Sequence, residues 1–198
     1  MKLQISRIMI FFLMGLLSLS VSSAYAKTAQ EILSTLPLQI GDFAVESSII
    51  AYEDEAMGAS LGYHSLSSFG SDLTVYIYNL GEQGIKDGVG SEAIRKAKDS
   101  ALEEMKSLEN TLYRNVKILS ETQTNFSLNN SKTLKVISVS FSLESISPLD
   151  GASLGNRFSY LYITGLKGYI CKIRATIPSL DKEKEIQKAV KTILSSLY

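Results

Sequence analysis

Runs of residues with strand character, separated by two long amphipathic segments, constrain the fold of this chain most. Asp72–Leu80 and Tyr169–Ile177 are rich in β-branched and aromatic side chains and alternate between apolar and polar positions. From Ser91 onwards, and again over Ile186–Leu197, apolar residues recur at steps of three and four, which predicts helices with one apolar face. Strands grouped around single helices are typical of α+β proteins. We expect one α+β domain over residues 27–198.

The expected sheet is mostly antiparallel and has about seven strands, with a long middle helix and a C-terminal helix packed on it. Thr28 and Glu31 have the spacing of a capping box, which predicts a short helix that ends before Pro37. Ser91 and Asp181 are expected to cap the two long helices. The expected strands are Phe43–Tyr52, Ser60–Leu66, Asp72–Leu80, Tyr113–Phe126, Thr133–Glu144, Arg157–Thr164 and Tyr169–Ile177.

The first 26 residues have the features of a secretory signal peptide. Lys2 and Arg7 make the start basic, Ile8–Leu17 is apolar, and Ala24-Tyr25-Ala26 has the small-x-small form that signal peptidase reads. The apolar run is shorter than the roughly 20 residues that a membrane-spanning helix needs, so a retained anchor is the alternative of lesser weight. We expect residues 1–26 to be a signal peptide. The mature protein is then periplasmic or secreted, without stable membrane insertion.

Charge and cysteine content exclude several classes of protein. The chain carries 20 basic and 20 acidic residues, and they are interspersed, as over Arg95–Lys106. A nucleic-acid-binding domain would instead show a clustered basic stripe, so no nucleic-acid partner is expected. Cys171 is the only cysteine, which excludes an intramolecular disulfide. It alternates with apolar residues and is expected to be buried; a thiol that pairs with a partner is the alternative.

The pentapeptide Gly-Ala-Ser-Leu-Gly occurs twice, at 58–62 and at 151–155. Each copy precedes an expected hairpin and then a helix, so two related halves are one interpretation and chance is the other. Both copies also match Gly-x-Ser-x-Gly, which in serine hydrolases lies between a strand and a helix. Here the expected contexts are different. A serine hydrolase that uses Ser60 or Ser153 with His64, the only histidine, is therefore the alternative function.

The sequence contains no other convincing catalytic or cofactor motif. Catalytic zinc usually requires two or three histidine or cysteine ligands, and the chain has one residue of each type. The cluster Glu53-Asp54-Glu55 lacks the spacing of a calcium loop. The glycine-rich segment Gly81–Gly90 lacks both the P-loop and the dinucleotide-binding patterns. We expect no catalytic residues, no metal and no cofactor.

Tyrosines and cations on the expected strands indicate a surface that binds a partner. Tyr160 and Tyr162 lie on one strand, and Lys172 and Arg174 lie on the next strand, opposite its apolar residues. Tyrosine and arginine are enriched where proteins bind partners. The alternative is that the tyrosines pack under helices with their hydroxyls at the rim. We expect these four residues to bind an envelope protein or a small ligand.

The order of elements resembles that of PsbP-like α-β-α sandwich domains. The resemblance covers most of Leu36–Tyr198, and the segments Asp72-Leu-Thr-Val-Tyr-Ile-Tyr and Gly165-Leu-Lys-Gly-Tyr-Ile-Cys-Lys-Ile-Arg are suggestive of it. Members of that family mostly act as binding or assembly factors. The resemblance therefore implies a non-catalytic role, although it transfers no functional residue. The chain also looks like exported bacterial proteins. We expect an exported, soluble, non-catalytic binding or accessory domain.

Overall fold

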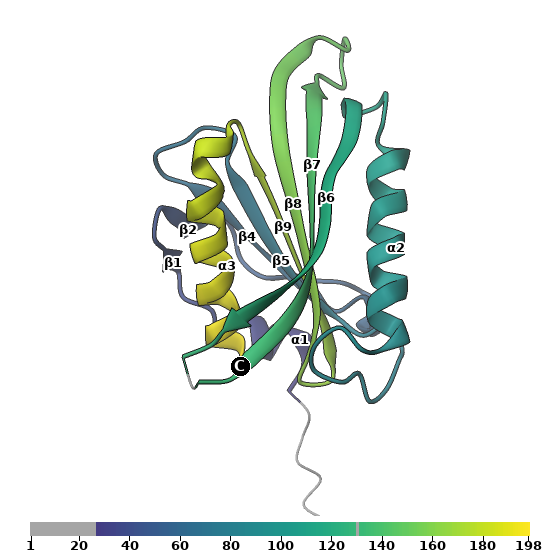
Figure 1. Cartoon of the computed structure of the whole chain (residues 1–198), viewed down its shortest axis with the longest axis vertical. Helices are drawn as coiled ribbons and strands as arrows, with labels where there is room; N and C mark the ends of the chain where they lie inside the picture. Colours follow the sequence, from purple (N-terminus) through teal and green to yellow (C-terminus); the bar gives the residue numbers. More distant parts are fainter. Residues whose placement is uncertain (1–26, 130) are drawn as a thin grey trace, which may run out of the picture.

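The computed structural model describes residues 27–129 and 131–198, and within them it shows an α+β fold (Figure 1). The expected signal peptide lies outside the described residues. The helices are α1 (Ala29–Leu33), α2 (Glu92–Ser107) and α3 (Glu183–Leu197), with 3₁₀ turns η1 (Glu55–Met57) and η2 (Leu180–Lys182). The strands are β1 (Gln39–Ile40), β2 (Phe43–Val45), β3 (Ile50–Ala51), β4 (Ala59–Ser65), β5 (Asp72–Tyr78), β6 (Tyr113–Ser127), β7 (Thr133–Ile146), β8 (Ser153–Leu166) and β9 (Tyr169–Ile177). Among the described residues, no helix has the length and apolar character that crossing a membrane requires.

The nine strands of the described residues belong to one antiparallel sheet of order β1-β2-β4-β5-β9-β8-β7-β6, with β3 paired to β4 beside β2. The expected antiparallel sheet is therefore confirmed, but the expected count of about seven strands is wrong. The two-residue strand β1 was not predicted. The expected strand Phe43–Tyr52 is in fact two short strands, because both β2 and β3 pair with β4 and the chain between them leaves the ladder after Glu46.

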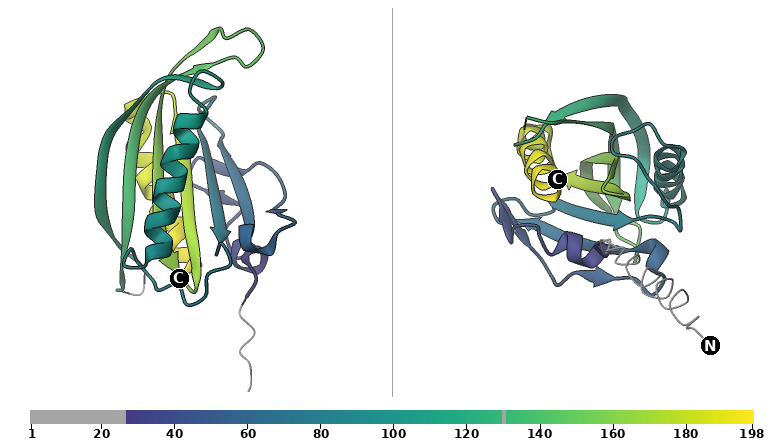
Figure 2. Two further views of the ribbon diagram at one scale, coloured as in Figure 1. Left: turned by 90° about the vertical axis from the view of Figure 1, so that its right-hand side faces the viewer. Right: turned by 90° about the horizontal axis from the view of Figure 1, so that it is seen from below.

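The two long helices pack on opposite faces of the sheet, as the two views of Figure 2 show. The core under α3 is the larger one. It also takes apolar residues from α1, from β4, β5, β8 and β9, and from the ends of β6 and β7 that curl around α3. A smaller core lies between α2 and the apolar residues of β7, β8 and β9. In β7, Val139, Phe141 and Leu143 are buried in this smaller core while the intervening serines are half-exposed, as expected.

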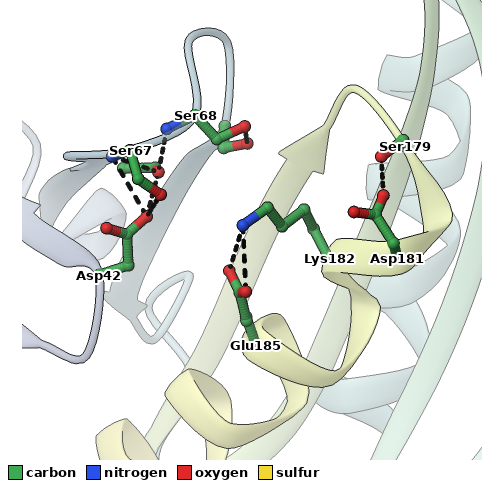
Figure 3. A network of polar contacts seen from close by, with 9 residues as sticks. Asp42, Ser67, Ser68, Ser179, Asp181, Lys182 and Glu185 are labelled. Carbon is green, nitrogen blue, oxygen red and sulfur yellow. Dashed lines mark hydrogen bonds and ion pairs between the residues drawn. The ribbon is translucent and has the colours of Figure 1, made fainter.

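The predicted helix caps are only partly confirmed. The capping box of Thr28 and Glu31 is confirmed at α1. Ser91 is the N-cap of α2, but its side chain makes no capping hydrogen bond to any described residue. Asp181 was wrongly predicted to cap α3. It lies in η2, where its carboxylate accepts a hydrogen bond from the Ser179 hydroxyl, and Lys182 takes the N-cap position (Figure 3).

The Asp42 carboxylate lies near the start of α3 and joins two turns at the same end of the sheet. Asp42, in the β1–β2 turn, accepts hydrogen bonds from the hydroxyls of Ser65 and Ser67 at the β4–β5 turn (Figure 3). These hydrogen bonds, that of Ser65 first, lower the pKa of Asp42. Lys182 lies nearby, paired at 3.1 Å with Glu185 of α3. The hydrogen bonds of Asp42 therefore connect the β1–β2 turn to the β4–β5 turn.

The first glycine of the pentapeptide has the same role in both copies. Gly58 and Gly151 both have positive φ, at 67° and 69°, and each leads the chain into a hairpin that is followed by a helix. At Gly58 a side chain is excluded by space as well, since a Cβ atom there would lie 1.9 Å from the Ile77 carbonyl oxygen. The helices that follow the two hairpins lie on opposite faces of the sheet. The two halves are therefore not arranged alike.

The core under α3 yields the first testable prediction. Ile193 is completely buried at the centre of the inner face of α3. Substitution Ile193→Ala leaves a cavity there, so we expect the free energy of unfolding to fall by about 2–5 kcal/mol. Urea denaturation measures this change. The exposed neighbour Lys191→Ala is the control, and an equal small effect of both substitutions would contradict the packing described.

Candidate functional site

The face of the sheet that carries α2 is only partly covered. α2 packs on β8 and β9, whereas the β4 and β5 part of the same face has no helix over it (Figure 2). Directly paired residues form rows across this face, of which two are Ser60–Tyr76–Lys172–Ile163 and Gly62–Thr74–Arg174–Leu161. Each row is polar or small on β4, β5 and β9 and becomes apolar on β8, under α2. Lys172 and Arg174 occupy the boundary.

Lys172 lies between the rings of β5 and the side of α2. Its Nζ is 4.5 Å from the centre of the Tyr76 ring, 5.9 Å from that of Tyr78 and 3.6 Å from Oε2 of Glu104. The lysine side chain is only 17% exposed, whereas the Glu104 side chain is 54% exposed. Loss of hydration lowers the pKa of Lys172, and the nearby charge of Arg174 lowers it further, although Glu104 acts in the opposite direction.

Arg174 lies two residues further along β9 on the same face. Its Nη2 donates a 2.9 Å hydrogen bond to the hydroxyl of Tyr113, and the guanidinium carbon lies 5.7 Å from the centre of that ring. Tyr113 begins β6, immediately after the turn that follows α2. Within the described part of the chain, the Tyr113 hydroxyl is the only hydrogen-bond acceptor of Arg174. The remaining N–H groups of the guanidinium have no protein acceptor among these residues.

These five residues form one group, which we call the cation cluster: Tyr76, Glu104, Tyr113, Lys172 and Arg174. Beside it a narrow crevice runs between α2 and the sheet, with Met105 and Leu161 on its apolar side. Its free volume is about 10 Å³, which suffices for one water molecule or one oxygen atom of a ligand. A larger ligand would therefore have to lie outside the crevice, over Tyr76 and the uncovered strands.

Tyr160 and Tyr162 lie on the opposite face of the sheet from Lys172 and Arg174. They are 4% and 3% exposed and belong to the core under α3, where the Tyr162 ring meets Phe126 edge-on at 6.1 Å. Burial raises the pKa of Tyr160 to about 12. The structure therefore divides the four residues predicted to bind. It keeps Lys172 and Arg174 together and places the two tyrosines where helix packing had been the alternative interpretation.

The serines of the alternative function are not brought to the histidine. Ser60 is 4% exposed, and its Oγ lies 3.0 Å from the hydroxyl of Tyr52. Ser153 begins β8, and its Oγ accepts a hydrogen bond from the amide of Gly155. His64 lies on β4 opposite Asp72, and its Nδ1 has no hydrogen-bond partner among the described residues. Neither serine lies on a turn from a strand into a helix, which a nucleophile elbow requires.

Other candidate positions offer fewer groups that could bind a ligand or take part in a reaction. Over residues 27–129 and 131–198, no group of three acidic, histidine or cysteine side chains is placed to hold a metal ion. Cys171 is buried in the core under α3, as expected, and burial raises the pKa of its thiol to about 12. A cavity of about 420 Å³ lies beside the start of α1, but among the described residues that line it Glu55 is the only one with a charged side chain. The cation cluster remains the strongest candidate site.

Sequence reasoning missed three members of the cation cluster, and Tyr76 was recognised only as part of a strand rich in β-branched and aromatic residues. Glu104 was assigned to a solvated helix face, because the alternation of charges along α2 does not reveal which strand it lies beside. Tyr113 was recognised only as the start of a strand. Its approach to Arg174 depends on the turn after α2 and on the coiling of the sheet, neither of which has a local sequence signal.

Comparison of the sequence with models of protein families gives no match, and comparison with curated proteins gives none either. The resemblance to PsbP-like domains therefore stays a prediction.

The burial of Lys172 leads to a prediction about stability and pH. Replacing buried ionic groups by apolar ones of similar size is often neutral or stabilising, so we expect Lys172→Met to keep or raise the free energy of unfolding at pH 7. The folded pKa of Lys172 lies below its ordinary value of 10.5. At pH values between the folded pKa of Lys172 and 10.5, the unfolded wild-type chain binds more protons than the folded protein. The free energy of unfolding of the wild type therefore rises with pH in this window, relative to that of Lys172→Met. The free energy of unfolding of Lys172→Met should exceed that of the wild type most at pH values below the folded pKa of Lys172.

Urea denaturation of both proteins between pH 7 and pH 10 tests this expectation, with the exposed Lys191→Met as the matched control. A loss of more than about 1 kcal/mol in Lys172→Met at pH 7 would show that the lysine is there for stability.

Proposed function

We propose that this protein is an exported, non-catalytic binding domain whose recognition surface is the cation cluster together with the uncovered face of β4 and β5. The observation that carries the proposal is the position of Lys172 and Arg174. Lys172 is held largely out of water with one partly exposed carboxylate, that of Glu104, as its partner, whereas the half-buried Arg174 forms no ion pair with any described residue. The sequence features of residues 1–26 support the periplasm or the extracellular space as the place where this surface works.

Stability alone gives no reason for this arrangement. Transfer of a charged group from water into a protein is unfavourable unless partners compensate it, and here the compensation is incomplete. Such groups are common where a protein binds another molecule, because the ligand supplies the missing partner. Tyrosine and arginine are also the residues that contribute most to binding interfaces. The cluster has both types, with Tyr76 and Tyr113 on either side of the cations.

The geometry favours binding over hydrolysis. A serine nucleophile requires a base within hydrogen-bond distance, and the hydroxyls of Ser60 and Ser153 have other partners than His64. The resemblance to PsbP-like domains, which is independent of the cluster, supports the same general class of role, an accessory or assembly factor.

Co-purification tests the proposal. The tagged protein is expressed in its own host and isolated from an envelope extract, and mass spectrometry identifies the proteins and small molecules that accompany it. We expect at least one species that is present with wild type, lost with Arg174→Ala and with Lys172→Met, and kept with Arg95→Ala. Arg95 is the matched control, because it lies exposed on α2 and, within residues 27–129 and 131–198, forms an ion pair with Glu92 alone.

Unfolding curves of each variant show that the loss does not come from unfolding. If wild type, Arg174→Ala and Lys172→Met carry the same set of species, the cation cluster is not the recognition surface and the proposal fails.

A further inference from the structure

We infer that the cation cluster binds a carboxylate group of its ligand, which replaces the Glu104 carboxylate as the partner of Lys172 and lies within hydrogen-bond reach of Arg174, beside the crevice that all three residues line. The inference rests on the proposed function and names the chemistry of the group that is recognised. It also assigns Glu104 a role, that of an internal competitor for the site.

The charge balance of the cluster favours an anion. Lys172 and Arg174 contribute two positive charges and Glu104 contributes one negative charge. The lowered pKa of Lys172 indicates that burial and repulsion by Arg174 together outweigh the attraction of Glu104. A second anion, or a better placed one, would relieve this repulsion. A cationic ligand would increase it.

The hydrogen-bonding groups favour a carboxylate in particular. Arg174 uses one N–H group on the Tyr113 hydroxyl, and the rest of its guanidinium has no acceptor within the described residues. A planar guanidinium can donate two parallel hydrogen bonds to the two oxygens of a carboxylate. The ammonium group of Lys172, on the same face of β9, adds a further donor. The crevice beside them admits about one oxygen atom, so the rest of the ligand would lie outside, next to Tyr76.

Glu104 is held loosely enough to be displaced. Its Oε2 lies 3.6 Å from Nζ of Lys172, which exceeds the roughly 2.7–2.9 Å of a hydrogen-bonded ion pair. Lys98 of the same helix and Glu121 of β6 show such a close pair at 2.8 Å. More than half of the Glu104 side chain is exposed, so its carboxylate can turn into water when another carboxylate takes its position.

Two sources can supply this chemistry, a small carboxylic acid or the C-terminal carboxylate of a peptide chain. Benzoate represents the first source and N-acetyl-trialanine the second. Benzyl alcohol and N-acetyl-trialanine amide are the matched neutral probes. Each is titrated into the protein by isothermal calorimetry at an ionic strength kept constant with chloride. Binding of benzoate or of N-acetyl-trialanine without binding of its neutral counterpart supports the inference and shows which source fits.

The variants give the decisive readout. Arg174→Ala and Lys172→Met should each weaken carboxylate binding by at least about tenfold, the loss expected for one charge-assisted hydrogen bond of 1.5–3 kcal/mol. Glu104→Gln should strengthen it by about two- to fivefold, since an exposed ion pair that competes for the site is worth up to roughly 1 kcal/mol. Glu103→Gln, an exposed neighbour on α2, should leave it unchanged.

If Glu104 instead bound the ligand directly, Glu104→Gln would weaken carboxylate binding. If Glu104→Gln leaves carboxylate binding unchanged or weakens it, or if neither carboxylate probe binds, the inference is wrong. The proposed function survives that result if a co-purifying species still depends on Arg174 and Lys172. The two failures are therefore distinguishable.

Discussion

The antiparallel pairing of β5 with β9 is the interaction on which the rest of this structure depends. All seven residues of β5 pair with β9, from Asp72 with Thr176 to Tyr78 with Ile170. The pairing joins the β4–β5 hairpin to the β8–β9 hairpin, although almost a hundred residues separate the two strands along the chain. Because side chains alternate across a strand, this single register also decides which residues meet on each face of the sheet.

One face becomes the main core and the other becomes the candidate site. Cys171 and Ile173 of β9 point to the α3 side together with Val75 of β5, and all three are buried. The alternate residues Lys172 and Arg174 point to the side of α2. α2 reaches only as far as β9, so its edge, with Glu104, lies beside the two cations. The boundary between a covered and an uncovered sheet therefore places charged groups in partly dehydrated surroundings without burying them completely.

Local patterns in the sequence predicted most elements and two of the five residues of the candidate site, Lys172 and Arg174. Side chains alternate between the two faces of β9, so Lys172 and Arg174 lie on the face opposite Cys171 and Ile173. This alternation is a property of one strand and can be predicted from the sequence of that strand. The face to which Tyr160 and Tyr162 point depends on the register between β8 and β9 and on the helix that covers that face, so these residues were misplaced. Likewise, β1 is too short to have a period, and the position of Glu104 depends on how α2 packs.

The central claim is that burial and the charge of Arg174 together outweigh the attraction of Glu104 at Lys172. An NMR titration of the protein with ¹³C-labelled lysines measures the pKa of the Lys172 ammonium directly, with the exposed lysines as internal references. The account predicts a pKa below the ordinary value of 10.5, and a still lower one in Glu104→Gln. A pKa at or above 10.5 would contradict it, because the lysine would then be fully compensated by Glu104 and would need no further partner.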